Sequence, residues 1–187
     1  MALGYEDWFI PKTPLNLMIG FVLLVWNTAF DSWKVFLGFI IAFIVGMTME
    51  ILGVSTGKIF GNYAYGANLG PKLLDVPYMI GLYWVVLVVI TSFIARKLSE
   101  SVILVSCIGA GLMVILDIFI EQMAPRFDFW KFEQHPVPLE NYIAWFVIAF
   151  ILHICVKHLV TQSSSRFSLH LYLSQLSFFA GSLFLLQ

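Results

Sequence analysis

Apolar residues are gathered into long runs, and polar stretches separate these runs from one another. A membrane-spanning helix needs roughly 20 mostly apolar residues, and six runs in the chain approach that length. They cover residues 15–30, 35–52, 76–95, 102–123, 142–160 and 169–186. Asn16 and Asn27 interrupt the first run, and Ser174 and Gln175 interrupt the sixth. The pattern predicts an all-α membrane protein, a polytopic bundle of about six transmembrane helices in a single integral membrane domain that takes in the whole chain.

The connections between the runs are unequal in length. Three short polar connections alternate with two long ones, at residues 54–75 and 124–141, which are rich in Gly, Pro and aromatic residues. With six spans, both long connections fall on the same face of the membrane. Loops that carry function are more often long and chemically specific than short and plain. Lys and Arg are divided evenly between the two faces, so the positive-inside pattern assigns no orientation.

The composition fits a membrane protein. Hydrophobic residues make up 60% of the chain and charged residues 11%, whereas about 25% of an ordinary soluble domain is charged. Aromatic residues reach 17%, more than anchoring at two membrane interfaces needs, so we expect some rings to line an internal site. The net charge of -1 leaves no basic stripe for nucleic acid. The two cysteines lie inside apolar runs and give no evidence about the redox compartment.

Three acidic residues lie near the ends of apolar runs. Glu50 is close to the end of the second run, and Asp117 and Glu121 are close to the end of the fourth. Even-numbered helices end on the face of the long loops, so all three carboxyls are expected in one half of the bilayer. Asp117 and Glu121 are four residues apart and share a helical face. Ionisable groups inside a membrane are costly and usually mark a site.

Odd-numbered helices begin on the same face, which brings Trp84, Asn141 and Trp145 into the same half of the bilayer. The predicted pocket therefore contains carboxyls and aromatic rings with little positive charge. Burial without a cation favours a neutral carboxylic acid, which can protonate an alkene, and aromatic faces can stabilise the resulting carbocation. Each residue also has a structural interpretation. An acid can hold two helices together by a hydrogen bond, and a tryptophan can anchor a helix at the interface.

Two groups of motif residues resemble a known family. The first is Glu50-x-x-Gly53-x-x-Thr56-Gly57-x-x-Phe60-Gly61-x-Tyr63-x-Tyr65, followed by Gly81-x-x-Trp84. The second is Asp117-x-x-x-Glu121, Asp128-x-Trp130 and Pro138-x-x-Asn141-Tyr142-x-x-Trp145. In order and spacing these residues resemble the membrane carotenoid 1,2-hydratases, the bisanhydrobacterioruberin hydratase-like group of carotenoid biosynthesis proteins. Two positions depart from the family pattern, namely Gln122, where the family has Pro, and Phe132, where it has Trp.

The resemblance implies that water is added across the terminal double bond of an acyclic carotenoid end group, without a cofactor or a metal. An acid protonates the alkene, and water captures the tertiary carbocation. The proton donor is expected to be Asp117 or Glu121, and Glu50 is expected to position or deprotonate the water. The residues expected to bind the substrate, its cation or the water are Tyr63, Tyr65, Trp84, Trp130, Asn141, Trp145, Thr56 and Phe60. Further expected partners are the lipid bilayer of a prokaryotic cell and other membrane enzymes of carotenoid biosynthesis.

Three alternatives remain open. Pro138-Leu139-Glu140-Asn141 resembles the Pro-x-Glu-Glu element of the small membrane-type lycopene cyclases. Cyclisation begins with the same protonation, but an internal alkene traps the cation. A non-enzymatic membrane transporter or lipid-binding module would be favoured by internal repeats and paired broken helices, and the sequence has neither. A membrane prenyltransferase would need a second acidic motif for magnesium-bound diphosphate.

Overall fold

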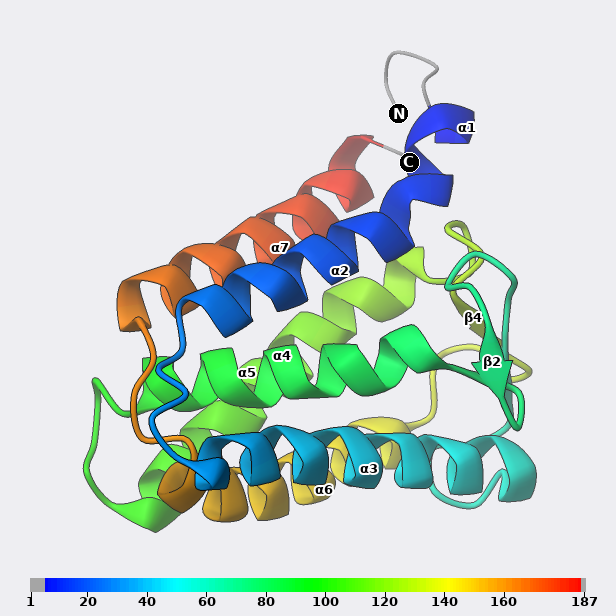
Figure 1. The fold of residues 1–187 in the computed structure, drawn as a ribbon. Coiled ribbons are helices and arrows are strands. Elements are labelled where there is room, and N and C mark those ends of the chain that lie inside the picture. Colours follow the sequence, from blue (N-terminus) through cyan, green and yellow to red (C-terminus); the bar gives the residue numbers. More distant parts are fainter. Residues whose placement is uncertain (1–5, 186–187) are drawn as a thin grey trace.

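The computed structural model describes residues 6–185 and is mainly helical (Figure 1). A short helix α1 (Glu6–Phe9) and a 3-10 turn η1 (Ile10–Lys12) open the described chain. The long helices that follow are α2 (Thr13–Trp26), α3 (Trp33–Thr56), α4 (Tyr78–Ala95), α5 (Val102–Met123), α6 (Leu139–Leu159) and α7 (Ser165–Leu185). The predicted all-α fold is confirmed.

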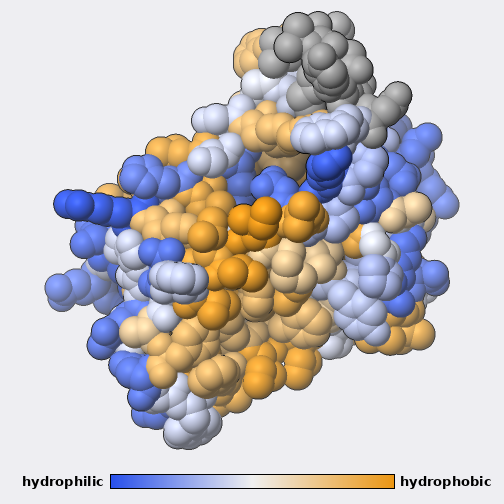
Figure 2. All heavy atoms as spheres, turned by 45° about the horizontal axis from the view of Figure 1, so that its top comes forward, coloured by the Kyte–Doolittle hydropathy of each residue, from blue (hydrophilic) through white to orange (hydrophobic). Residues whose placement is uncertain are grey.

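Helices α3, α4, α5 and α6 are long and apolar enough to cross a membrane. Helix α2 is apolar but has only 14 residues, and α7 is long but is interrupted by polar residues such as Gln175. Figure 2 shows a broad hydrophobic band between two hydrophilic ends of the molecule. The chain is therefore a polytopic membrane protein. Residue 186, at the end of the expected sixth run, lies outside the described residues.

Helix α4 lies at the centre of the bundle and contacts each of the other five long helices. Its residues from Tyr83 to Phe93 are buried without interruption, as expected for a helix that is apolar on every side. Helices α2 and α7 lie over one side of α4, whereas α3 and α6 lie on the other (Figure 1). Helix α5 also packs extensively on α4, so residues of α4 face neighbouring helices on every side.

Both long connections lie at the same end of the bundle (Figure 1). Strand β1 (Tyr63–Tyr65) in the first pairs antiparallel with β4 (Trp130–Phe132) in the second, with Tyr65 opposite Trp130. Strands β2 (Lys72–Leu73) and β3 (Val76–Pro77) form a second antiparallel pair that leads into α4. Successive side chains of a strand point to opposite faces, so Tyr63 and Tyr65 are both buried while Ala64 is exposed.

Several helix boundaries differ from the ends of the apolar runs. Helix α2 ends at Trp26, before the expected residue 30, and α7 begins at Ser165, before the expected residue 169. Helix α3 continues past residue 52 to Thr56, where Gly57 adopts the left-handed conformation with φ of 65°. Helix α6 begins at Leu139, directly after Pro138, so Asn141 lies in its first turn. An apolar run ends where the side chains become polar. A helix ends or begins at a residue whose backbone does not continue it, such as Gly or Pro. Helices of a membrane protein can therefore extend beyond their apolar runs.

Candidate active site

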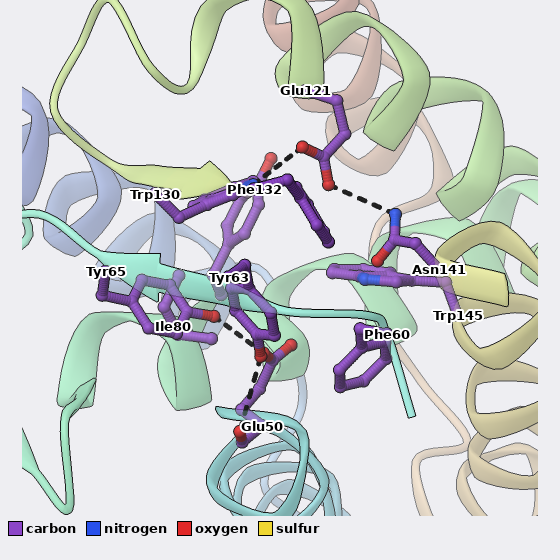
Figure 3. Close-up of a pocket in the computed structure, with 11 residues that line it drawn as sticks. Glu50, Phe60, Tyr63, Tyr65, Ile80, Glu121, Trp130, Phe132, Asn141 and Trp145 are labelled. Atoms are coloured by element: carbon purple, nitrogen blue, oxygen red, sulfur yellow. Dashed lines mark hydrogen bonds between the residues drawn. The ribbon is translucent and has the colours of Figure 1, made fainter. Parts of the chain in front are cut away.

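Three carboxyl groups are buried at the end of the bundle that carries the long connections. Glu50 on α3 is 2% exposed, and Asp117 and Glu121 on α5 are 1% and 5% exposed. Figure 3 shows Glu50 and Glu121 on opposite sides of one small cavity, with aromatic rings around it. The carboxyls of Glu50 on α3 and Glu121 on α5 therefore line the same enclosed cavity.

Glu50 accepts hydrogen bonds from three neutral donors. The hydroxyls of Tyr63 and Tyr65 donate to its Oε2 at 2.6 and 2.7 Å (Figure 3). The indole Nε1 of Trp84 donates to its Oε1 at 3.0 Å. An ionised carboxylate only accepts hydrogen bonds, so this set of donors suits Glu50 as an anion.

The two tyrosines come from strand β1, outside the membrane-spanning helices. Burial raises the pKa of the Tyr63 hydroxyl above its usual range, and the nearby Glu50 carboxyl raises it further. The same two causes raise the pKa of the Tyr65 hydroxyl. Both phenols therefore keep their protons at neutral pH and remain hydrogen-bond donors to Glu50.

Asn141 joins the two carboxyls of α5. Its Nδ2 donates to Asp117 Oδ2 at 3.1 Å and to Glu121 Oε1 at 3.2 Å. The indole of Trp130 donates to the other oxygen of Glu121 at 2.8 Å. The second oxygen of Asp117 is buried and accepts no hydrogen bond from the described residues. Asp117 is therefore tied to Glu121 through a single amide group.

Trp84 stacks on Trp145 with their ring centroids 4.3 Å apart and their planes 18° apart. The stack is possible because Gly46 on α3 has no side chain. A Cβ at Gly46 would lie only 2.5 Å from Trp84 Cγ. Small residues let helices approach closely in membranes. Here the close approach brings the Trp84 indole within hydrogen-bonding distance of Glu50.

The cavity has a volume of about 20 Å³, and a single water molecule needs about 10–15 Å³. It therefore has room for one water molecule and no room for a carotenoid end group as well. The residues predicted for the site that line it are Glu50, Glu121, Phe60, Tyr63, Tyr65, Trp130, Asn141 and Trp145. The structure brings these residues together from α3, α5, α6 and both long connections.

Three of the residues predicted for the site do not line the cavity. Asp117 lies behind Asn141, and Trp84 reaches the cavity only through its hydrogen bond to Glu50 and its stack on Trp145. Thr56 is exposed, and its hydroxyl donates to the backbone oxygen of Leu52 at 2.5 Å. Thr56 therefore belongs to the end of α3 and not to the cavity.

The cavity is also lined by Ile80 and Tyr83, which no sequence motif singled out, and by Phe132, which was noted only as a departure from the family pattern. Tyr83 is buried, and its hydroxyl donates to Gln175 on α7 at 2.7 Å. Gln175, the hydrogen-bond partner of Tyr83, is visible in the sequence as a polar residue inside an apolar run. A polar side chain that is partly buried between helices favours a hydrogen-bond partner, so Gln175 could have indicated a partner on another helix.

Residues 13–186 match the family described as "Carotenoid biosynthesis protein". The chain belongs to this family. It is also 32% identical over 107 residues to bisanhydrobacterioruberin hydratase of Haloarcula japonica. That match covers 52% of this chain and 36% of the relative, so the chain spans little more than a third of the relative's length. No solved structure matches the chain.

The carotenoid biosynthesis family fits the surroundings of the cavity, because carotenoids are apolar and the cavity lies in a membrane protein. Among residues 6–185, no three His, Cys, Asp or Glu side chains are grouped so that they could hold a metal ion. The groups that can carry chemistry here are two carboxyls across a space of water size, with aromatic rings between them. Such a site can donate a proton on one side and accept one on the other.

The segment Pro138-Leu139-Glu140-Asn141, which resembles the lycopene cyclase element but has Asn141 in place of its second acid, does not bring its glutamate to the cavity. Glu140 is exposed in the first turn of α6, whereas its neighbour Asn141 is buried between the two acids of α5. The glutamate of this motif therefore lies outside the cavity.

Proposed function

We propose that this carotenoid biosynthesis protein is a hydratase that adds water across the terminal double bond of an acyclic carotenoid end group. One observation carries the proposal. Glu50 and Glu121 line a single aromatic cavity that has room for one water molecule. The name of the Haloarcula japonica relative, a hydratase, supports the same reaction class. We place the protein in a prokaryotic cell membrane.

Glu121 acts as the proton donor. It lines the cavity, whereas Asp117 does not. Each of its oxygens accepts one N–H, from Trp130 and from Asn141, and a carboxyl oxygen has a second lone pair that can carry a proton. The π electrons of the terminal double bond form a C–H bond with this proton at the less substituted carbon. The other carbon becomes a tertiary carbocation, and Glu121 becomes a carboxylate.

Glu50 acts as the base for water. The water oxygen forms the C–O bond with the cationic carbon while one water proton passes to the Glu50 carboxylate. The three donors to Glu50 stabilise that carboxylate before the reaction. The product is a tertiary alcohol, and the net change is the addition of one water molecule. Return of the proton from Glu50 to Glu121 restores the site.

The aromatic lining stabilises the carbocation. Trp130 and Trp145 line the cavity with Tyr63 and Tyr65, and a cation over an aromatic face gains about 2 kcal/mol or more when water is excluded. The rings also limit the number of water molecules near the cation. With one water in the cavity, capture by oxygen competes with loss of a proton back to the alkene.

The proposal is tested by producing the chain in cells that accumulate lycopene and growing them in water enriched in ¹⁸O. We expect new pigments heavier than lycopene by one labelled water for each reacted end. A cyclic product with the mass of lycopene would instead identify a cyclase. Lycopene that stays unchanged, although the protein is folded in the membrane, would contradict hydration of this substrate.

A further inference from the structure

A second, larger cavity lies between α2 and α7, with α1 and η1 at one end. Its volume is about 400 Å³, against about 20 Å³ for the cavity between the carboxyls. Helices α2 and α7 both pack on α4 but make little contact with each other, which leaves this groove between them. Its α2 side is formed by Leu15, Ile19, Gly20 and Leu23. Leu15, Ile19 and Leu23 are exposed, so the groove opens towards the lipid.

Tyr83 lines both cavities. It projects from α4 towards α7, where its hydroxyl donates to Gln175, itself a lining residue of the groove. The side chain of Tyr83 therefore forms the partition between the groove and the cavity with the carboxyls.

Aromatic rings connect the two spaces along a second path. Phe178 of the groove contacts Phe127 at 6.0 Å between ring centroids, and Phe127 contacts Phe129 at 5.4 Å. Phe129 lines the groove and contacts Trp130 at 6.0 Å. Trp130 donates its N–H to Glu121. A chain of packed aromatic rings thus connects the groove to the proposed proton donor.

We propose that this groove binds the polyene chain of the substrate, and that the Tyr83 side chain moves aside so that the end group enters the widened cavity and reaches Glu121. This inference rests on the proposed function. The cavity between the carboxyls has no room for a substrate, so the long apolar part of a carotenoid must lie elsewhere. The groove shares a wall with that cavity and opens to the bilayer in which a carotenoid dissolves.

The charges of the groove favour an uncharged apolar occupant over a phospholipid. Its lining contains one basic residue, Lys12. The Lys12 amine already donates to the backbone oxygen of Trp8 at 2.9 Å and lies 3.7 Å from the centre of the Trp8 ring. A phosphate headgroup would have to displace these contacts, whereas a hydrocarbon polyene would not.

Gly20 allows the groove to be filled selectively. A Cβ at this position would meet only Leu171 Cδ1, at 3.9 Å, which is an ordinary contact. Gly20→Leu therefore places a side chain in the groove without a clash at its first atom. Gly111→Leu is the matched control, because a Cβ at Gly111 on α5 would meet no neighbouring atom within 4 Å, and Gly111 does not line the groove. Leu23→Trp, at a half-exposed lining position, is a second groove variant.

Binding is measured on the purified full chain in detergent micelles with lycopene as the probe. All proteins carry Glu121→Gln to prevent turnover, and induced circular dichroism of the polyene reports binding. We expect Gly20→Leu and Leu23→Trp to weaken binding about tenfold or more, a change of about 1.4 kcal/mol, while Gly111→Leu leaves it unchanged. Parent-like binding by both groove variants, or equal displacement of lycopene by dioleoylphosphatidylcholine, would overturn the inference.

Pigment analysis of proteins with an intact Glu121 separates this inference from the proposed function. Lycopene that binds in the groove but yields no hydroxylated product would contradict the hydratase and leave the groove as a polyene site. Hydroxylated product formed as fast by both groove variants as by the parent would contradict the groove and leave the hydratase.

Discussion

At the scale of single residues, the position of each carboxyl suggests its role. Glu121 and Glu50 line the cavity, whereas Asp117 contacts it only through Asn141. A group that donates a proton must come within hydrogen-bonding distance of the reacting atom. Asp117 is therefore a positioning residue in our proposal. It holds the amide that also donates to Glu121.

The amide variants of the two acids on α5 separate these roles. Glu121→Gln keeps the size and hydrogen bonding of the side chain but removes its acidic proton, so we expect turnover to fall about 100-fold or more. Asp117→Asn should cost less than about tenfold, because its Oδ can still accept from Asn141. The measurement is hydroxylated carotenoid formed per folded protein. A larger loss in Asp117→Asn than in Glu121→Gln would exchange the two assignments.

At the scale of secondary-structure elements, the close contact between α3 and α4 sets the position of Glu50. Gly46 lies against the ring of Trp84, and Trp84 donates to Glu50 one turn further along α3. The same helix pair contains Gly81, where a Cβ would lie 2.5 Å from Met47 Cγ. Glycines on both helices therefore allow α3 and α4 to approach closely, and this approach brings the Trp84 indole within hydrogen-bonding distance of Glu50.

Gly46→Ala tests whether this contact supports the site. The added methyl would force Trp84 to move, and overpacking of this kind costs about 1–3 kcal/mol. We expect a lower melting temperature and a loss of turnover, because the displaced indole no longer donates to Glu50. Gly111→Ala, at a position with open space, should change neither quantity. Parent-like melting and turnover in Gly46→Ala would show that the ring adjusts without cost.

The sequence was sufficient for the helices but not for their rotation about their own axes. Long apolar runs predicted the membrane helices, and the direction of each helix predicted that Glu50 and Glu121 lie in the same half of the bundle. Thr56 shares the motif with Glu50, but six residues at about 100° each turn it to another side of α3. Tyr83 is adjacent to Trp84, and the same rotation directs it towards α7. Packing fixes these directions, and one sequence does not reveal the packing.

At the scale of the whole molecule, the two long connections form one structure over the end of the bundle. Strand β1 pairs with β4, and the carboxylate of Asp128 accepts from the backbone N–H groups of Ala67 and Asn68 at 2.8 and 3.2 Å. The sequence predicted that both connections lie on one face. Their pairing depends on contacts between segments about 60 residues apart, which no local pattern indicates. This pairing brings Tyr65 beside Trp130. Tyr65 donates a hydrogen bond to Glu50, and Trp130 donates one to Glu121.

Asn68 connects three parts of the chain and offers a test of this organisation. Its Nδ2 donates to the backbone oxygens of Ile10 and Phe127, both at 2.9 Å. Asn68→Ala removes the hydrogen bond to the Phe127 oxygen, and losing a partner of a buried group costs about 1–3 kcal/mol. The Ile10 oxygen loses one donor but still accepts from the hydroxyl and the backbone N–H of Thr13. We expect thermal unfolding at a lower temperature and weaker turnover, because Trp130 follows Phe127 closely and loses its fixed position beside Glu121. Gln134→Ala, at an exposed position of the second long connection, is the control and should behave as the parent. If Asn68→Ala melts early but turns over at the parental rate at low temperature, the connections stabilise the fold without positioning Trp130. Trp130 would then be held in position by the pairing of β1 with β4 alone.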